Sequence, residues 1–257
     1  MHNTLNVAYR KMGNGEPLLI LHGLFGSSDN WQTLAKSYAE HYEVYLIDQR
    51  NHGHAPHISS HSYREMSDDI LEMVASLGLK NLRIIGHSMG GKTAMYFAQQ
   101  HAEYVYKLVV ADMGIKAYPR HHDLIFRGIN AVDVKSCDSR KTATERLSIH
   151  ISDVGTQQFL LKNLYWKEPG VLAWRFNAEV LEREIEEVLK PIQDTPVNIP
   201  TLFIRGGKSD YIKDEDIESI RQIFPHASLE TIEGAGHWLH AEGPSEFLEK
   251  TTTFLMS

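Results

Sequence analysis

The sequence is poor in cysteine, with Cys137 the only one among 257 residues. A single cysteine cannot form an internal disulfide, so we expect a protein of a reducing compartment, the cytoplasm. Cys137 stands in the polar stretch KSCDSR, without the helix-opening glycines of a nucleophilic site. We therefore interpret it as an incidental thiol.

Long apolar runs are also missing. No stretch approaches the roughly 18 uninterrupted apolar residues of a membrane span, so we expect no membrane partner. The N-terminal residues, MHNTLNVAYRKMGNG, lack the basic start and the apolar run of a signal peptide. This agrees with the cytoplasmic expectation.

Positive charge is in short supply. The 26 lysines and arginines are outnumbered by 33 aspartates and glutamates, which gives a net charge of -7 at pH 7. Binding to nucleic acid needs a concentrated basic patch, so we expect no nucleic-acid partner. The histidine-rich stretch RNHGHAPHISSH lacks the HExxH spacing, cysteines and dense carboxylates of metal sites, and we expect no metal. The sequence is compatible with both a monomer and a homodimer.

Short apolar runs alternate with amphipathic helical patterns along most of the chain. This alternation is typical of an α/β protein with a mostly parallel central sheet and helices on both faces. The predicted strands are 5–10, 17–22, 44–48, 82–86, 105–112, 201–205 and 228–232. The predicted helices between them are 30–40, 63–77, 90–100 and 245–255.

Residues 113–198 interrupt this alternation and show no clear strand. Four helical patterns stand in this stretch, at 123–131, 141–151, 155–164 and 177–189. We predict a core domain of residues 1–112 and 199–257 and a helical cap of residues 113–198, over the sheet edge where such folds bind ligands. In the alternative, these helices simply enlarge the core. Four aromatic residues of the cap could line an acyl site or fill the cap's own interior: Phe126, Phe159, Trp166 and Trp174.

The segment Gly86-His87-Ser88-Met89-Gly90 lies between a predicted strand and a predicted helix. Gly-x-Ser-x-Gly alone arises by chance, but in this setting it indicates a sharp turn that exposes a nucleophilic serine. The turn can close only where the residues two before and two after the serine lack side chains. The helix that follows points its N-terminal amides at the reacting carbonyl. We therefore predict Ser88 as a nucleophile.

A serine hydroxyl needs a base to remove its proton. His237 is the candidate, because it stands in a glycine-rich loop after the last predicted strand, whereas His240 is better read as structural. Chain order requires a carboxylate between nucleophile and base. Asp112 and Asp210 both follow strands, and either could orient the imidazole.

A developing oxyanion needs amides that already point at it. The Met89 amide follows the nucleophile at the start of a helix. The second donor is expected from His22-Gly23-Leu24-Phe25-Gly26, after an early strand. We assign it to the Leu24 amide, with Phe25 next in line and His22 bracing the loop.

Several segments together resemble the small bacterial serine esterases of the YbfF type, within the α/β-hydrolase fold. They are LHGLFGSSDNW, DQRNHGHAPH, GHSMGGKTAM, KLVVAD, IRGGKSDYI and GAGHWLHAE, which span nearly the whole predicted sheet. The resemblance implies a helical cap and a triad acid after the sixth strand of the fold, and Asp112 matches that position. It also implies a supporting serine near the histidine, matched by Ser209. Asp210 departs from the proline expected there, which keeps it open as the acid.

Members of this group hydrolyse short acyl esters and some acyl thioesters without a cofactor. We therefore predict a serine carboxylesterase for short- to medium-chain acyl esters, and acyl thioesters as further substrates. One alternative is a C–C hydrolase or lyase of the menaquinone-pathway type, which would need an anion-binding set of arginines in the cap. The candidates are Arg120, Arg127, Arg175 and Arg183. The other alternative is a non-catalytic binding protein on the same scaffold.

Overall fold

The computed structural model describes residues 7–134, 136–137 and 139–257. A seven-stranded sheet, in the order β1-β3-β2-β4-β5-β8-β9, forms its centre. β1 pairs antiparallel with β3, and every other pairing in this sheet is parallel. The strands are β1 (Ala8–Met12), β2 (Glu16–Leu21), β3 (Tyr42–Asp48), β4 (Leu82–His87), β5 (Val105–Ala111), β8 (Thr201–Gly206) and β9 (Ala227–Ile232).

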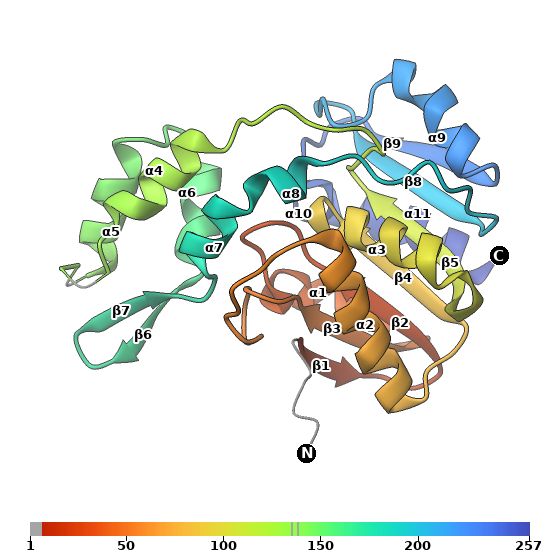
Figure 1. Ribbon diagram of the computed structural model, residues 1–257, viewed down its shortest axis with the longest axis horizontal. Helices are drawn as coiled ribbons and strands as arrows, with labels where there is room; N and C mark the ends of the chain where they lie inside the picture. Colours follow the sequence, from red (N-terminus) through yellow and green to blue (C-terminus); the bar gives the residue numbers. More distant parts are fainter. Residues whose placement is uncertain (1–6, 135, 138) are drawn as a thin grey trace.

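Alternate residues of the central strands feed two apolar cores, one on each face of the sheet. In β2, Leu19 and Leu21 belong to the core under three helices, α2 (Tyr63–Leu77), α3 (Met89–Gln100) and α9 (Ile217–Ile223). Leu18 and Ile20 belong to the core under α1 (Gln32–Tyr38) and α11 (Pro244–Met256). This is the period of two that a strand imposes on its side chains. In Figure 1, α2 and α3 lie in front of the sheet and α11 behind it. The sheet is therefore covered on both faces, as the sequence predicted.

The helices around the sheet follow the predicted patterns closely. In α2, an apolar stripe faces the sheet, Ser62 caps the start, and Gly78 ends the helix with a φ of 65°. Two helices were not predicted: α9, whose seven residues carry only three apolar positions, and α10, which is a single turn of four residues. The helices are α1 (Gln32–Tyr38), α2 (Tyr63–Leu77), α3 (Met89–Gln100), α9 (Ile217–Ile223), α10 (Leu239–Glu242) and α11 (Pro244–Met256), with short 3-10 turns η1 (Ser28–Trp31), η2 (Ala102–Tyr104) and η3 (Asp214–Asp216).

Residues 113–198, which we call the inserted segment, join β5 to β8 and lie mainly on the left of Figure 1. Five strands of the described chain precede this segment, and the last of them, β5, is the strand that the resemblance counts as the sixth of the fold. It contains α4 (Asp123–Ala131), α5 (Arg140–Ser148), α6 (Val154–Leu161), β6 (Leu164–Glu168), β7 (Val171–Trp174), α7 (Ala178–Arg183) and α8 (Ile185–Leu189). The expectation of a segment without strands was therefore wrong.

The hairpin of β6 and β7 turns at Pro169-Gly170. Gly170 has a φ of 79°, a conformation that favours glycine, and proline before glycine suits such a turn. The predicted helix 177–189 is also two helices, because the backbone leaves the helical conformation at Glu184.

The inserted segment has an apolar core of its own, which reaches onto the sheet domain. The ring of Phe25 packs edge-on against Phe126 and Phe176 at centroid distances of 5.4 Å and 5.2 Å. Met89, the first residue of α3, joins the same core. The inserted segment is therefore seated directly over the end of β4 and the loop after β2.

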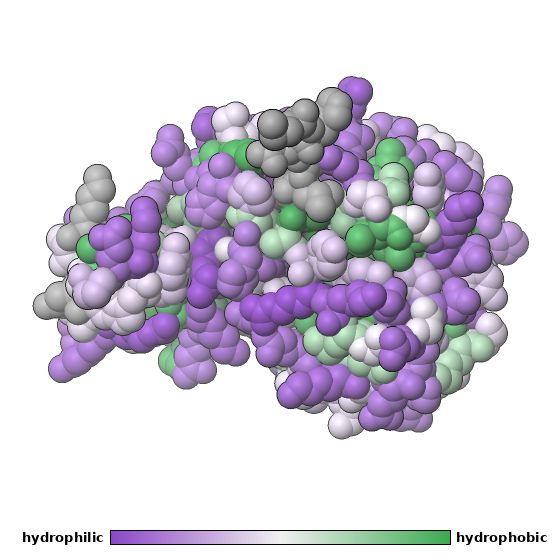
Figure 2. All heavy atoms as spheres, turned by 90° about the horizontal axis from the view of Figure 1, so that it is seen from below, coloured by the Kyte–Doolittle hydropathy of each residue, from purple (hydrophilic) through white to green (hydrophobic). Residues whose placement is uncertain are grey.

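The surface is largely hydrophilic on the face that Figure 2 presents, where hydrophobic side chains appear in small separate groups. Among the described helices, none is both long and apolar enough to cross a membrane.

Candidate active site

Ser88 occupies the turn between β4 and α3 in a strained backbone conformation, with φ 52° and ψ -119°. Such conformations cost of order 1–3 kcal/mol and gather at functional sites. The two flanking glycines make the turn possible. A Cβ on Gly86 would lie 2.3 Å from the Gly90 carbonyl oxygen, and one on Gly90 would lie 2.4 Å from the Leu21 carbonyl oxygen. The requirement for small residues two before and two after the serine is thus a matter of backbone contact.

Three side chains from separate loops form a continuous hydrogen-bonded row. The Ser88 hydroxyl donates to Nε2 of His237 over 3.0 Å, and Nδ1–H of His237 donates to Oδ2 of Asp112 over 2.7 Å. His237 lies between β9 and α10, and Asp112 follows β5 directly. In this arrangement, an acid orients an imidazole that lies beside a serine. The same arrangement supports nucleophilic catalysis on several unrelated folds.

Asp112 is the carboxylate that meets the imidazole. Its side chain is 0% exposed, and it also accepts hydrogen bonds from the Gly206 amide over 3.1 Å and from the Ser209 hydroxyl. Asp210 points the other way: its side chain is 95% exposed and lies 3.6 Å from the Lys213 ammonium. Of the two carboxylates that the residues alone left open, only Asp112 reaches His237.

The loop after β2 holds amides close to Ser88. Phe25 N–H donates to Nε2 of His52 over 3.1 Å, so this amide already has a partner. In the described chain, by contrast, no protein group accepts a hydrogen bond from the Leu24 or the Met89 amide. His22 braces the loop, because its ring bonds both the Gly23 carbonyl and the Gln49 amide. Of the three amides considered for the oxyanion, those of Leu24 and Met89 are therefore the two without a protein acceptor in the described chain.

Three buried, neutral imidazoles lie next to the site and hold its loops in place. Desolvation lowers the pKa of His22, His52 and His87, which keeps these rings uncharged. Nε2–H of His87 donates to the His237 carbonyl over 2.8 Å, which ties the strand before the nucleophile to the histidine loop. His240 stacks on Trp31 with ring centroids 4.3 Å apart, a structural position. Among the described residues, no group of three or more histidine, cysteine or acidic side chains could hold a metal ion.

Tyr211 is a site residue that the sequence analysis missed. Its ring stacks on His237 with centroids 4.0 Å apart and an interplanar angle of 16°. Burial raises the pKa of Tyr211 to about 12, and its hydroxyl lies 3.0 Å from Nε2 of His121. The only signal in the sequence was its place two residues after Ser209, in the loop that follows β8.

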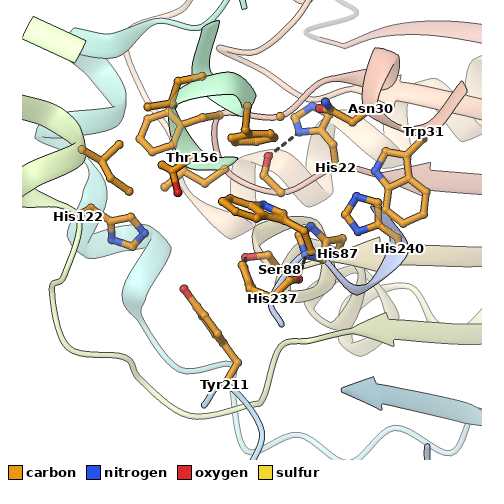
Figure 3. A pocket seen from close by; sticks show the side chains of 18 of the residues that line it. His22, Asn30, Trp31, His87, Ser88, His122, Thr156, Tyr211, His237 and His240 are labelled. Atoms are coloured by element: carbon orange, nitrogen blue, oxygen red, sulfur yellow. Dashed lines mark hydrogen bonds between the residues drawn. The ribbon is translucent and has the colours of Figure 1, made fainter. Parts of the chain in front are cut away.

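A cavity of about 250 Å³ opens beside Ser88 and His237. Figure 3 shows His122 and Thr156 of the inserted segment across the cavity from these two residues, with Tyr211 at one side. Of the four aromatic residues considered for this wall, Phe159 lines the cavity. The other three lie elsewhere: Phe126 packs on Phe25, Trp166 is 46% exposed, and Trp174 stacks on Phe176.

Comparisons with known proteins agree with this architecture. A family model described as the α/β hydrolase fold matches residues 16–135. The sn-1-specific diacylglycerol lipase ABHD11 of Mus musculus is 38% identical over 93% of this chain and 80% of its own length. Esterase YbfF of Escherichia coli is 34% identical over 94% of each chain, which confirms the resemblance drawn from the motifs.

A solved structure titled a marine microorganism esterase superposes with a TM-score of 0.95. It is 44% identical to this chain, and the alignment covers 98% of this chain and 100% of that one. With the two relatives, it places the chain among esterases and lipases. The chain therefore belongs to the α/β-hydrolase fold family and is a hydrolase.

Proposed function

We propose that this hydrolase is a serine carboxylesterase that cleaves short- to medium-chain acyl esters through an acyl-enzyme intermediate. The observation that carries the proposal is the row Ser88–His237–Asp112, with its hydroxyl end at the cavity of about 250 Å³. Residues 1–112 and 199–257 form the core domain that bears this row. Residues 113–198 act as the cap that closes the cavity.

In this mechanism, Ser88 attacks the ester carbonyl carbon while Nε2 of His237 takes the hydroxyl proton. Asp112 holds the imidazole in the required tautomer and stabilises the imidazolium that forms. The amides of Leu24 and Met89 stabilise the tetrahedral oxyanion. His237 then protonates the departing alcohol, and a water that the same imidazole activates releases the carboxylic acid.

Ser209 supports this row as a fourth member. Its hydroxyl donates a hydrogen bond to Oδ2 of Asp112, the same oxygen that accepts the hydrogen bond from Nδ1–H of His237. Together with the Gly206 amide, it limits the rotation of the carboxylate. Such outer hydrogen bonds commonly fix the orientation of a working side chain.

The size and lining of the cavity support the choice of acyl group. A volume of about 250 Å³ holds roughly eight groups the size of a water molecule, at about 30 Å³ each. Most of the cavity wall is apolar, and Ile125, Phe159 and Leu160 of the inserted segment are among the lining residues. The names of the relatives, esterase and diacylglycerol lipase, also favour an ester substrate. A thioester would offer the same carbonyl to Ser88 and remains a further substrate class.

A C–C hydrolase or lyase fits less well, because it would need cationic groups at the cavity. No arginine lies among the described residues that line it. Arg120 instead pairs with Asp123, and Arg183 pairs with Glu184. A non-catalytic binding protein would have no need for a hydrogen-bonded row of three groups.

The test is Ser88→Ala, assayed on p-nitrophenyl acetate and hexanoate. We expect a loss of roughly 10⁴-fold or more in kcat, because one group carries the nucleophilic oxygen. A fluorophosphonate probe should label the unaltered protein and leave the variant unlabelled. Hydrolysis by the variant close to the unaltered rate would disprove the proposal, as would an unaltered protein that the probe does not label.

A further inference from the structure

The inserted segment is attached to the sheet domain through two adjacent stretches of chain, residues 113–118 and 189–192, which we call the neck. Two backbone hydrogen bonds join them: Tyr118 N–H donates to the Leu189 carbonyl, and Ile192 N–H donates to the Ile115 carbonyl, each over 3.0 Å. Figure 1 shows both connections running from the sheet side to the inserted segment. Any tilt of the inserted segment relative to Ser88 must bend this neck.

Lys92 binds both stretches of the neck at once. Its ammonium nitrogen Nζ donates to the Lys116 carbonyl over 2.9 Å and also to the Lys190 carbonyl. The same nitrogen lies 4.8 Å from the centre of the Tyr118 ring and 5.9 Å from that of Tyr63. The side chain thus joins α3 to the entry and the exit of the inserted segment.

The surroundings of Lys92 are unusual for a lysine. The residue is 0% exposed, and in the described chain no carboxylate forms an ion pair with it. Burial lowers the pKa of Lys92 to about 7. An amine without a carboxylate is expensive to bury, so a plain apolar residue here would serve stability at least as well. The amine adds two directed hydrogen bonds to backbone carbonyls, one in each stretch of the neck.

Lys92 is also tied to the reacting residues. Its own amide donates to the Ser88 carbonyl over 3.1 Å, one helical turn after the nucleophile. The first neck strand begins directly after Asp112 and leads to His121 and His122, which line the cavity. One side chain therefore links the nucleophile's helix with the chain that carries the acid and the far wall of the pocket.

We propose that Lys92 is a positioning residue that fixes the inserted segment over Ser88 and thereby sets the affinity for the acyl group. It touches no reacting atom, so it acts on the pocket wall rather than on proton transfer. This inference rests on the proposed esterase function. Its structural part, the rigidity of the neck, can be measured without any activity.

Lys107 provides a matched control. Its residue is 5% exposed, and its Nζ donates to the Phe254 carbonyl over 2.8 Å and also to the Ser257 carbonyl. Lys107 lies in β5, and its partners lie at the C-terminal end of α11. It therefore has the same kind of bonds as Lys92 but no contact with the neck.

The experiment compares Lys92→Met with Lys107→Met on p-nitrophenyl acetate and hexanoate. For Lys92→Met, we expect KM for the hexanoate to rise about five- to tenfold and kcat for the acetate to change by less than about twofold. Amide hydrogen exchange at residues 113–118 and 189–192 should become at least about tenfold faster. For Lys107→Met, we expect neither a change in KM nor faster exchange in the neck.

The inference is overturned if Lys92→Met leaves both readouts unchanged, if acetate and hexanoate lose equally, or if Lys107→Met reproduces the pattern. Should Lys92→Met fail to fold, Tyr63→Phe decides, because the Tyr63 hydroxyl donates to the Val188 carbonyl over 2.7 Å, just before the second neck strand. It should raise KM for the hexanoate about two- to threefold, with faster exchange at 189–192. No change in either would also overturn the inference. A protein inactive on every ester would refute the proposed function alone, since the exchange measurement would still test the neck.

Discussion

The two parts of the molecule that meet at the cavity are organised in contrasting ways. On the sheet side, each group of the proposed mechanism follows a strand end by one to five residues, and Ser88 and Asp112 both have positive φ values. The inserted segment consists of helices of five to nine residues and one hairpin, packed on a core of its own. We infer that the rate of reaction depends on the first part and the choice of acyl group on the second.

Asp112→Asn would sharpen this comparison most strongly. An amide at this position would favour the wrong imidazole tautomer, so we expect kcat to fall about 10³- to 10⁴-fold for acetate and hexanoate alike. Steady-state kinetics on both esters measures the effect. Asp210→Asn is the matched control and should stay within about twofold of the unaltered protein, because its carboxylate is exposed. Equal losses in the two variants would contradict the assignment of the acid.

Phe159→Ala addresses the other side of the cavity. Phe159 lies on α6, lines the cavity and packs on Trp238 with ring centroids 5.3 Å apart. Removing the ring should weaken binding of the hexanoate about tenfold, which corresponds to about 1.4 kcal/mol of lost apolar contact. KM for acetate should change far less.

Trp166→Ala serves as the control for that variant, because this aromatic residue of the inserted segment lies outside the cavity lining. Its kinetics should match those of the unaltered protein. If Phe159→Ala lowered kcat equally for both esters, the separation of rate from acyl choice would be wrong.

Ser209→Ala should have the smallest effect. It removes one donor from the Asp112 carboxylate but leaves the Gly206 amide in place. We expect kcat to fall about threefold for both esters, with KM unchanged. A loss as large as that of Asp112→Asn would mean that the hydroxyl takes a more direct part than holding the carboxylate.

Much of the fold could be predicted, because buried parallel strands leave a simple record in the sequence. Residues 18–21 of β2 and 108–111 of β5 are apolar throughout, and α2 carries its apolar residues at helical spacing. The hairpin of β6 and β7 escaped prediction, because β6 mixes apolar and charged residues and β7 has only four residues. Its turn, Pro169-Gly170, was the available signal.

The proposed site divides in the same way. Ser88 and His237 could be predicted from local patterns, because a tight turn and a glycine-rich loop constrain the residues around them. The choice between Asp112 and Asp210 could not be made from the residues alone, since both follow strands and only the backbone direction decides which one turns inward. Tyr211 and Lys92 were missed because their partners are far away in the chain and are partly backbone atoms.

The hydrogen bond between the Phe25 amide and His52 determines how the loop after β2 responds to mild acid. Once Nε2 of His52 is protonated, it can no longer accept the hydrogen bond from the Phe25 amide. Charging this ring would therefore release the loop that carries Leu24. Desolvation holds the pKa of His52 well below its ordinary value. Because the His52 ring is buried and stays neutral, moderate acidification should leave the position of the Leu24 loop unchanged.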